Sequence, residues 1–199
     1  MIGKPEDAEN AFLQARTMAY EIDSRRLAEY PVWQLAQLSL EIGDLKNADI
    51  WTKELLALAE SNGDEHSNSF VHSHLCLYSL SKGSLDEAKD YLDRCRKALP
   101  KIPHIRSLAF SLALEISLLL ADPDWVPSEE LVNVAIDRFE RTARYAASDL
   151  LASAIGEGLI RSNQHSKATE LIGHYINEMR RELCAPSARL DATLRKLNF

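Results

Sequence analysis

The sequence is poor in the residues that build β-sheets and turns. Valine and threonine each occur only 5 times in 199 residues, and glycine and proline each occur 7 times. Sheets need β-branched side chains and frequent turns, so this scarcity argues against a sheet protein. Leucine (30) and alanine (24) dominate instead, as is typical of helices. We therefore expect an all-α chain.

Other absences exclude further classes of protein. The formal net charge is −7, so the chain lacks the basic footprint with which proteins bind nucleic acid. The longest apolar run, 108–121, is too short and too interrupted to span a bilayer, and the N-terminus lacks the apolar core of a signal peptide. The three cysteines form no CxxC pair, which favours free thiols in a reducing cytosol. We expect a cytoplasmic protein with no membrane contact and no direct nucleic-acid contact.

A 40-residue repeat organises the chain. Gly3, Gly43 and Gly83 are 40 residues apart, and the same count leads to Pro123 and Asn163. A small residue follows each of these positions five residues later: Ala8, Ala48, Ala88, Ser128 and Ala168. Apolar residues recur at helical spacing between the turns, so each unit is expected to be two antiparallel helices, stacked on its neighbours in a right-handed superhelix. The small residue is expected where the second helix crosses the first.

The third unit departs from this pattern. A longer loop at 121–127 replaces the turn, and strict register would put Glu115 at an apolar position. We therefore expect the helix before this loop to be shifted by a few residues. Ser84 and Glu87 form a predicted capping box, and Ser128 is predicted to begin a helix. The first helices of the units are expected at 27–42, 70–82, 104–121 and 145–162.

The repeat frame begins and ends within a unit. A second helix is expected at about 6–22 with no first helix before it, and a first helix at about 186–199 with no second helix after it. Complete arrays normally end in polar capping helices. We therefore expect the single repeat domain 1–199 to be part of a larger protein, or its ends to be covered by oligomerisation.

The turn sequences at 43–48 and 83–88, GDLKNA and GSLDEA, resemble the Gly-x-(aromatic or Leu)-x-x-Ala turn of tetratricopeptide repeats. The small residues seven positions before the turns, Ala36, Cys76 and Gly156, match as well. This resemblance implies an α-solenoid of about ten helices. The common unit of the family has about 34 residues. A unit of 40 is similar to the long-unit branch, which includes sensor solenoids of bacterial ATPase transcription regulators of the maltose-regulator kind, and eukaryotic scaffold proteins.

The resemblance also implies a ligand-binding groove. In this family the first helices line the concave face, which places inward the positions i, i+4 and i+8 of each. The residues so implied are Trp33, Gln37 and Glu41, then Ser73, Leu77 and Ser81, then Ser153, Glu157 and Arg161, with Tyr30 and Phe70 at the rim and Phe110 in the shifted third unit. A mixed aromatic and polar strip suits a peptide or an elongated small ligand. The alternative is that Trp33 only packs between units.

The residues that carry catalytic or metal chemistry do not converge. His72 and Cys76 share a helical face, but His74 points away from them, and a zinc site needs three or four converging ligands. Cys95 and Cys184 lack a motif that would activate a thiol. The sequence contains no nucleotide-binding or hydrolase motif. We expect no enzyme, no metal and no cofactor.

The sequence therefore predicts a non-catalytic binding module. The favoured interpretation is the effector-sensing or partner-sensing segment of a larger bacterial signalling or transcription-regulatory protein. The alternative is a protein–protein interaction scaffold with no regulator attached. The expected partner is a protein, a peptide or a small effector in the groove.

Overall fold

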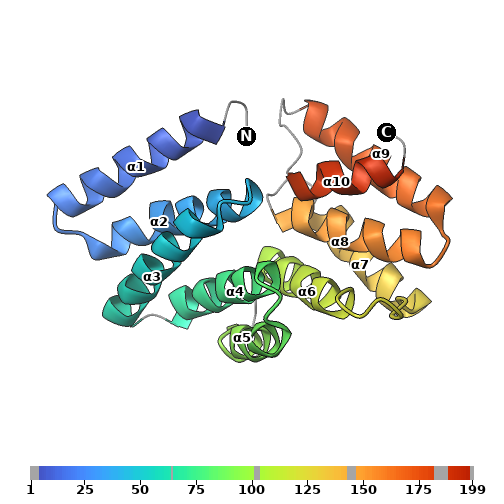
Figure 1. Ribbon diagram of the computed structural model, residues 1–199, viewed down its shortest axis with the longest axis horizontal. Helices are drawn as coiled ribbons and strands as arrows, with labels where there is room; N and C mark the ends of the chain where they lie inside the picture. The colour runs from blue at the N-terminus through green and yellow to red at the C-terminus, as the bar shows by residue number, and fades with distance from the viewer. Residues whose placement is uncertain (1–4, 64, 101–103, 143–146, 182–187, 198–199) are drawn as a thin grey trace. The chain divides into compact units, whose positions relative to one another are not determined.

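The computed structural model describes residues 5–63, 65–100, 104–142, 147–181 and 188–197, and the regular structure in these ranges is α-helical throughout (Figure 1). The helices are α1 (Pro5–Glu21), α2 (Arg25–Glu41), α3 (Leu45–Asn62), α4 (Glu65–Ser81), α5 (Leu85–Lys97), α6 (Ile105–Leu119), α7 (Glu129–Thr142), α8 (Ala147–Arg161), α9 (His165–Arg181) and α10 (Ala188–Lys196). The predicted all-α fold is confirmed. Across the described ranges, every helix is too short or too polar to cross a membrane.

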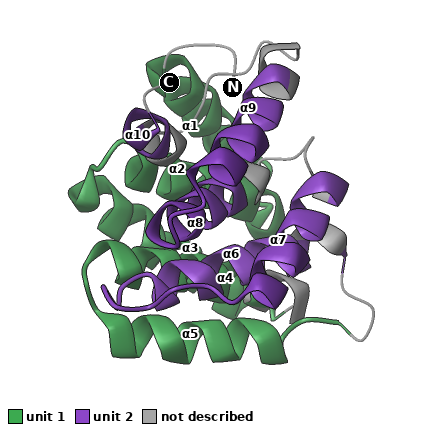
Figure 2. Ribbon diagram, turned by 90° about the vertical axis from the view of Figure 1, so that its right-hand side faces the viewer, with its two compact units in different colours: residues 1–100 green, residues 101–199 purple. Residues whose placement is uncertain are grey.

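The chain divides into two compact units, residues 1–100 and 101–199 (Figure 2). In unit 1, each helix from α1 to α5 packs on the next one, and α2 also contacts α4. In unit 2, α8 packs against α6, α7, α9 and α10. First helices of consecutive repeats therefore touch within each unit, as in helical repeat folds. A continuous superhelix over residues 1–199 stays a prediction.

The turn inside a repeat has the same backbone geometry at three places. Gly43, Gly83 and Asn163 have φ angles of 79°, 76° and 57°, in the left-handed region. Each donates its N–H to the carbonyl three residues back, and the next residue donates to the carbonyl five residues back. This is the Schellman motif, which favours glycine and then asparagine. The predicted turns at 43, 83 and 163 are confirmed, and Gly3 lies outside the described residues.

A second turn, between consecutive repeats, also recurs after 40 residues. Asp23 and Gly63 have φ angles of 52° and 63°. At the first of these turns the Ser24 N–H donates to the Ala19 carbonyl across 2.9 Å. The sequence pattern did not reveal this turn, because Asp23 and Gly63 are different residue types.

Small residues occupy the predicted helix crossings. Ala48, Ala88 and Ala168 have no exposed surface. Gly156 is buried as well, and a Cβ atom there would lie 2.5 Å from Ile172 Cδ1. Close approach of the two helices therefore requires these small side chains, as predicted.

The prediction that Ser128 occupies the same crossing position is wrong. Ser128 is exposed, and its Oγ accepts from the Leu131 N–H at 3.2 Å, so it caps α7. Because α7 begins four residues later than strict register requires, Val132 is buried in place of position 128. In α6, Leu114 is fully buried and Glu115 only half-buried, which fits the expected shift.

The predicted capping box of α5 does not form. Ser84 stands at the N-cap, but its side chain makes no capping hydrogen bond. Glu87 instead accepts from Ser79 Oγ at 3.5 Å, which draws its carboxylate toward α4. On α3 the same position holds Asp44, which accepts from the Asn47 N–H at 3.0 Å.

Candidate functional site

Three aromatic rings meet on one face of unit 1. Tyr30 and Trp33 lie on α2 at i and i+3, and Phe70 lies on α4. The Tyr30 and Trp33 ring centroids are 6.0 Å apart, and those of Trp33 and Phe70 are 5.5 Å apart in an edge-to-face arrangement. We call these three residues the aromatic surface. The sequence placed them together through the repeat register, and the structure confirms that they touch.

The aromatic surface is partly open to solvent. Tyr30 is 64% exposed and Phe70 is 37% exposed, and the neighbouring Leu27 is 58% exposed. Trp33 packs against the core of unit 1, yet its buried Nε1 has no hydrogen-bond partner among the described residues. Exposed aromatic side chains around a partly buried tryptophan are the kind of anchors that dominate binding surfaces.

Two polar features shape the N-terminal end of this surface. Gln34 Nε2 donates to the Tyr30 hydroxyl at 2.7 Å, so the hydroxyl proton of Tyr30 is directed to another acceptor. Pro31 lies inside α2 and has no N–H, so the Leu27 carbonyl lacks its usual donor four residues later. An exposed helix therefore carries a backbone acceptor beside Tyr30. The signal for it was a proline in a helical segment.

A buried polar chain lies below the C-terminal end of the surface. Gln37 Nε2 is 3.2 Å from His74 Nδ1, and His74 Nε2 is 2.7 Å from Thr52 Oγ1. Thr52 Oγ1 in turn donates to the Ala48 carbonyl at 2.6 Å. The chain links α2, α4 and α3. His74 has no exposed surface, and burial lowers its pKa to about 4, because desolvation penalises the imidazolium.

The other predicted groove residues of unit 1 divide into two groups. Gln37 and Glu41 are half-buried on α2, next to the aromatic surface. Ser73 and Leu77 on α4 are each only 4% exposed, and Ser73 Oγ donates to the Phe70 carbonyl at 2.7 Å. The prediction that Ser73 and Leu77 line a surface is therefore wrong, because both side chains are buried.

The predicted groove residues of unit 2 are engaged within the chain. Ser153 Oγ lies 3.0 Å from Thr193 Oγ1, and Lys196 donates to Glu157 at 2.6 Å, so α10 meets both positions. Arg161 donates to the Asp122 carbonyl at 2.9 Å. Phe110 is half-buried on α6. The structure does not join these residues to an aromatic cluster like that of unit 1.

The histidine and cysteine residues of α4 have structural partners. The His72 ring stacks on Tyr91 at 6.4 Å, and both ring nitrogens of His74 are occupied. Burial raises the pKa of Cys76 to about 12 and that of Cys95 to about 11, so both thiols stay protonated. Among the described residues, no three His, Cys, Asp or Glu side chains could hold a metal ion. Cys184 lies outside the described residues.

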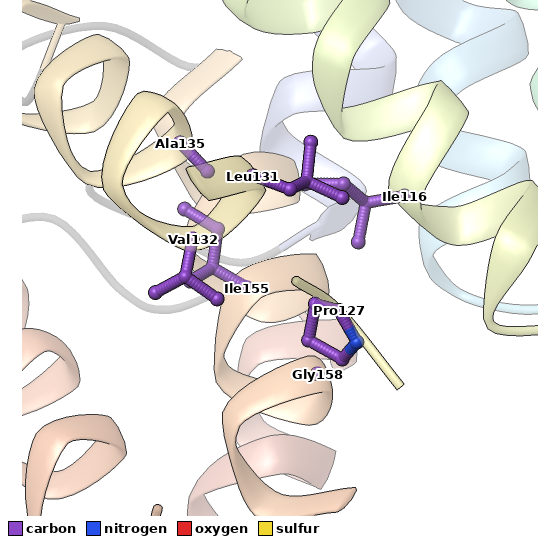
Figure 3. Close-up of a pocket in the computed structure, with 7 residues that line it drawn as sticks. All are labelled: Ile116, Pro127, Leu131, Val132, Ala135, Ile155 and Gly158. Carbon is purple, nitrogen blue, oxygen red and sulfur yellow. The ribbon is translucent and has the colours of Figure 1, made fainter. Parts of the chain in front are cut away.

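A small apolar pocket in unit 2 is too small for a ligand. It lies between α6, α7, α8 and the loop before α7, and has a volume of about 10 Å³ (Figure 3). Ligand pockets usually measure hundreds of Å³. Its lining residues are Ile116, Pro127, Leu131, Val132, Ala135, Ile155 and Gly158. Their apolar side chains make this a packing gap in the core of the unit.

Comparisons with protein-family models, curated proteins and solved structures gave no match for this chain. Function must therefore be argued from the aromatic surface and the polar residues that border it.

Proposed function

We propose that this protein is a helical-repeat binding module and that its partner, an extended peptide segment, docks on the aromatic surface of unit 1. The observation that carries the proposal is the contact of Trp33 with both Tyr30 and Phe70, on a face where two of the rings are exposed. Aromatic rings bury a large apolar area at low entropic cost, so such a cluster favours a partner with apolar side chains.

A peptide fits this surface better than a compact small molecule. The surface follows α2 from Leu27 to Gln37, which is roughly 15 Å at 1.5 Å per residue, or about four residues of an extended chain. Its polar groups lie at the two ends, beside Leu27 and at Gln37, with the rings between them. A peptide has alternating polar backbone and apolar side chains that match this order.

The wider role that we propose is sensing within a larger bacterial signalling or transcription-regulatory protein of the tetratricopeptide type. Its support is the 40-residue period and the turn sequences at 43–48 and 83–88. The alternative is a scaffold with no regulator attached. The full coding sequence discriminates between them, since the sensor requires an ATPase with a GxxxxGK[ST] loop and a helix-turn-helix domain in the same protein.

The binding proposal is tested with peptides selected on the immobilised protein from a random-peptide library. We expect Tyr30→Ser to weaken the selected peptides about tenfold, the effect of losing one hot-spot side chain. Tyr20→Ser is the matched control, because Tyr20 is a partly exposed tyrosine (39%) on α1, away from the surface. Equal loss in both variants, or peptides that bind regardless of Tyr30, would overturn the proposal. Circular dichroism of each variant verifies that helicity is unchanged.

A further inference from the structure

The side-chain amide of Gln37 has a direction that is fixed from inside the protein. Thr52 Oγ1 lies 2.6 Å from the Ala48 carbonyl and 2.7 Å from His74 Nε2. A hydroxyl has one proton, and a carbonyl has none to give. Thr52 must therefore donate to Ala48, and the proton between Thr52 and His74 must belong to His74 Nε2.

This proton count determines the rest of the chain. His74 is fully buried and neutral, and a neutral imidazole carries one N–H, so its Nδ1 is an acceptor. The group facing Nδ1 at 3.2 Å must then be the Nε2 donor of Gln37, as the structure has it. The carbonyl oxygen Oε1 of Gln37 takes no part in this chain. It is an acceptor one helical turn beyond Trp33, on the same face of α2.

We infer that the buried Thr52–His74 pair orients the Gln37 amide so that its Oε1 accepts a backbone N–H of the bound peptide. This inference rests on the proposed function and adds the polarity of the contact. The Leu27 carbonyl, which lacks its helical donor because of Pro31, is a second acceptor at the other end of the same surface. The site thus selects ligands that bring N–H donors to both ends of the aromatic surface. Gln37 contacts the ligand, while Thr52 and His74 are positioning residues.

The orientation is tested without any ligand, by long-range ¹H–¹⁵N NMR of the histidine rings at neutral pH. We expect His74 of the wild type to carry its proton on Nε2. Thr52→Val removes the acceptor and should shift the tautomer population toward Nδ1–H, whereas Thr52→Ser keeps the hydroxyl and should preserve Nε2–H. A wild-type His74 protonated on Nδ1, or a tautomer that ignores Thr52→Val, would overturn the inference. A merely structural role for Thr52 would change stability and leave the tautomer unmoved.

The ligand half is tested with a library-selected peptide and its single N-methyl derivatives, each of which lacks one backbone N–H. We expect one N-methyl derivative to bind the wild type roughly threefold to tenfold more weakly, the worth of one neutral hydrogen bond. The same derivative should lose no affinity for Gln37→Met, a variant of similar length with no acceptor. If every derivative loses as much with Gln37→Met as with the wild type, Gln37 accepts no peptide N–H. A library without any binder that depends on Tyr30 overturns the proposed function instead, and the tautomer spectra separate the two failures.

Discussion

Gln37 on α2 donates to His74 on α4 across 3.2 Å, and this one contact joins the candidate binding surface to the buried centre of unit 1. On its other side, the His74 ring reaches Thr52 on α3. Three helices therefore share a single buried imidazole, which must stay neutral because both of its nitrogens are already committed. Its protonation is costly, and this cost has consequences for stability.

The stability of the protein should fall with pH because of His74. Its pKa lies near 4 in the folded state and at 6.5 when unfolded, so the unfolded chain binds the proton more readily. The contribution of neutral His74 is therefore complete above pH 6.5 and is lost progressively as the pH falls toward 4. The total loss from this shift is about 3 kcal/mol. Urea unfolding at a series of pH values measures it.

The matched variant for this experiment is His74→Gln. It should be less stable than the wild type near neutral pH, because the packing and the chain of hydrogen bonds change. Its free energy of unfolding should then decline less steeply between pH 6.5 and 4. The lowered pKa of His72 adds a decline in the same direction, so the comparison is between slopes. Parallel slopes for both proteins would show that His74 titrates normally.

The turn glycines should tolerate asparagine better than alanine. Gly43 has φ of 79°, and an added Cβ would meet no atom within 4 Å, so the cost of substitution is that of the backbone alone. We expect Gly43→Ala to lower the free energy of unfolding by about 1 kcal/mol. Gly43→Asn should cost less, since Asn163 forms the same turn with φ of 57°. Thermal unfolding measures both, and a cheaper alanine would contradict the left-handed turn.

Enlarging a crossing residue should separate two helices. Ala48 is fully buried on α3, so Ala48→Leu should lower the free energy of unfolding by about 1–3 kcal/mol, the usual cost of overpacking. Ala57 lies on the same helix but is exposed. Ala57→Leu should therefore change stability by less than about 0.5 kcal/mol. Equal effects in urea unfolding would mean that position 48 is not a close crossing.

Periodicity predicted the parts of the fold that depend on one residue at a time. The turn at Gly83 and the small residue Ala88 could be placed because left-handed backbone and close crossings restrict the residue type directly. Ser128 failed because the preceding loop is longer, and a shift of about one turn is invisible to a fixed count. Ser84 failed because Glu87 found a partner in Ser79, on another helix.

The candidate site was predictable only in part, for the same reason. The aromatic residues could be grouped because Tyr30 and Trp33 share a helical face and Phe70 sits 40 residues after Tyr30. Burial of Leu77 depends on how other elements cover α4, which one helix does not encode. The contact of Gln37 with His74 joins residues 37 positions apart, and no spacing rule announces it.

The most direct test of the proposed binding surface uses the three tryptophan indole N–H signals in ¹H–¹⁵N NMR. Trp33 lies in the aromatic surface, Trp51 on α3 and Trp125 in the loop before α7, so each reports on a different place. Addition of a library-selected peptide should shift the Trp33 signal with increasing concentration and leave those of Trp51 and Trp125 in place. A peptide that binds while Trp33 stays unmoved, or that shifts Trp125 instead, would contradict the account.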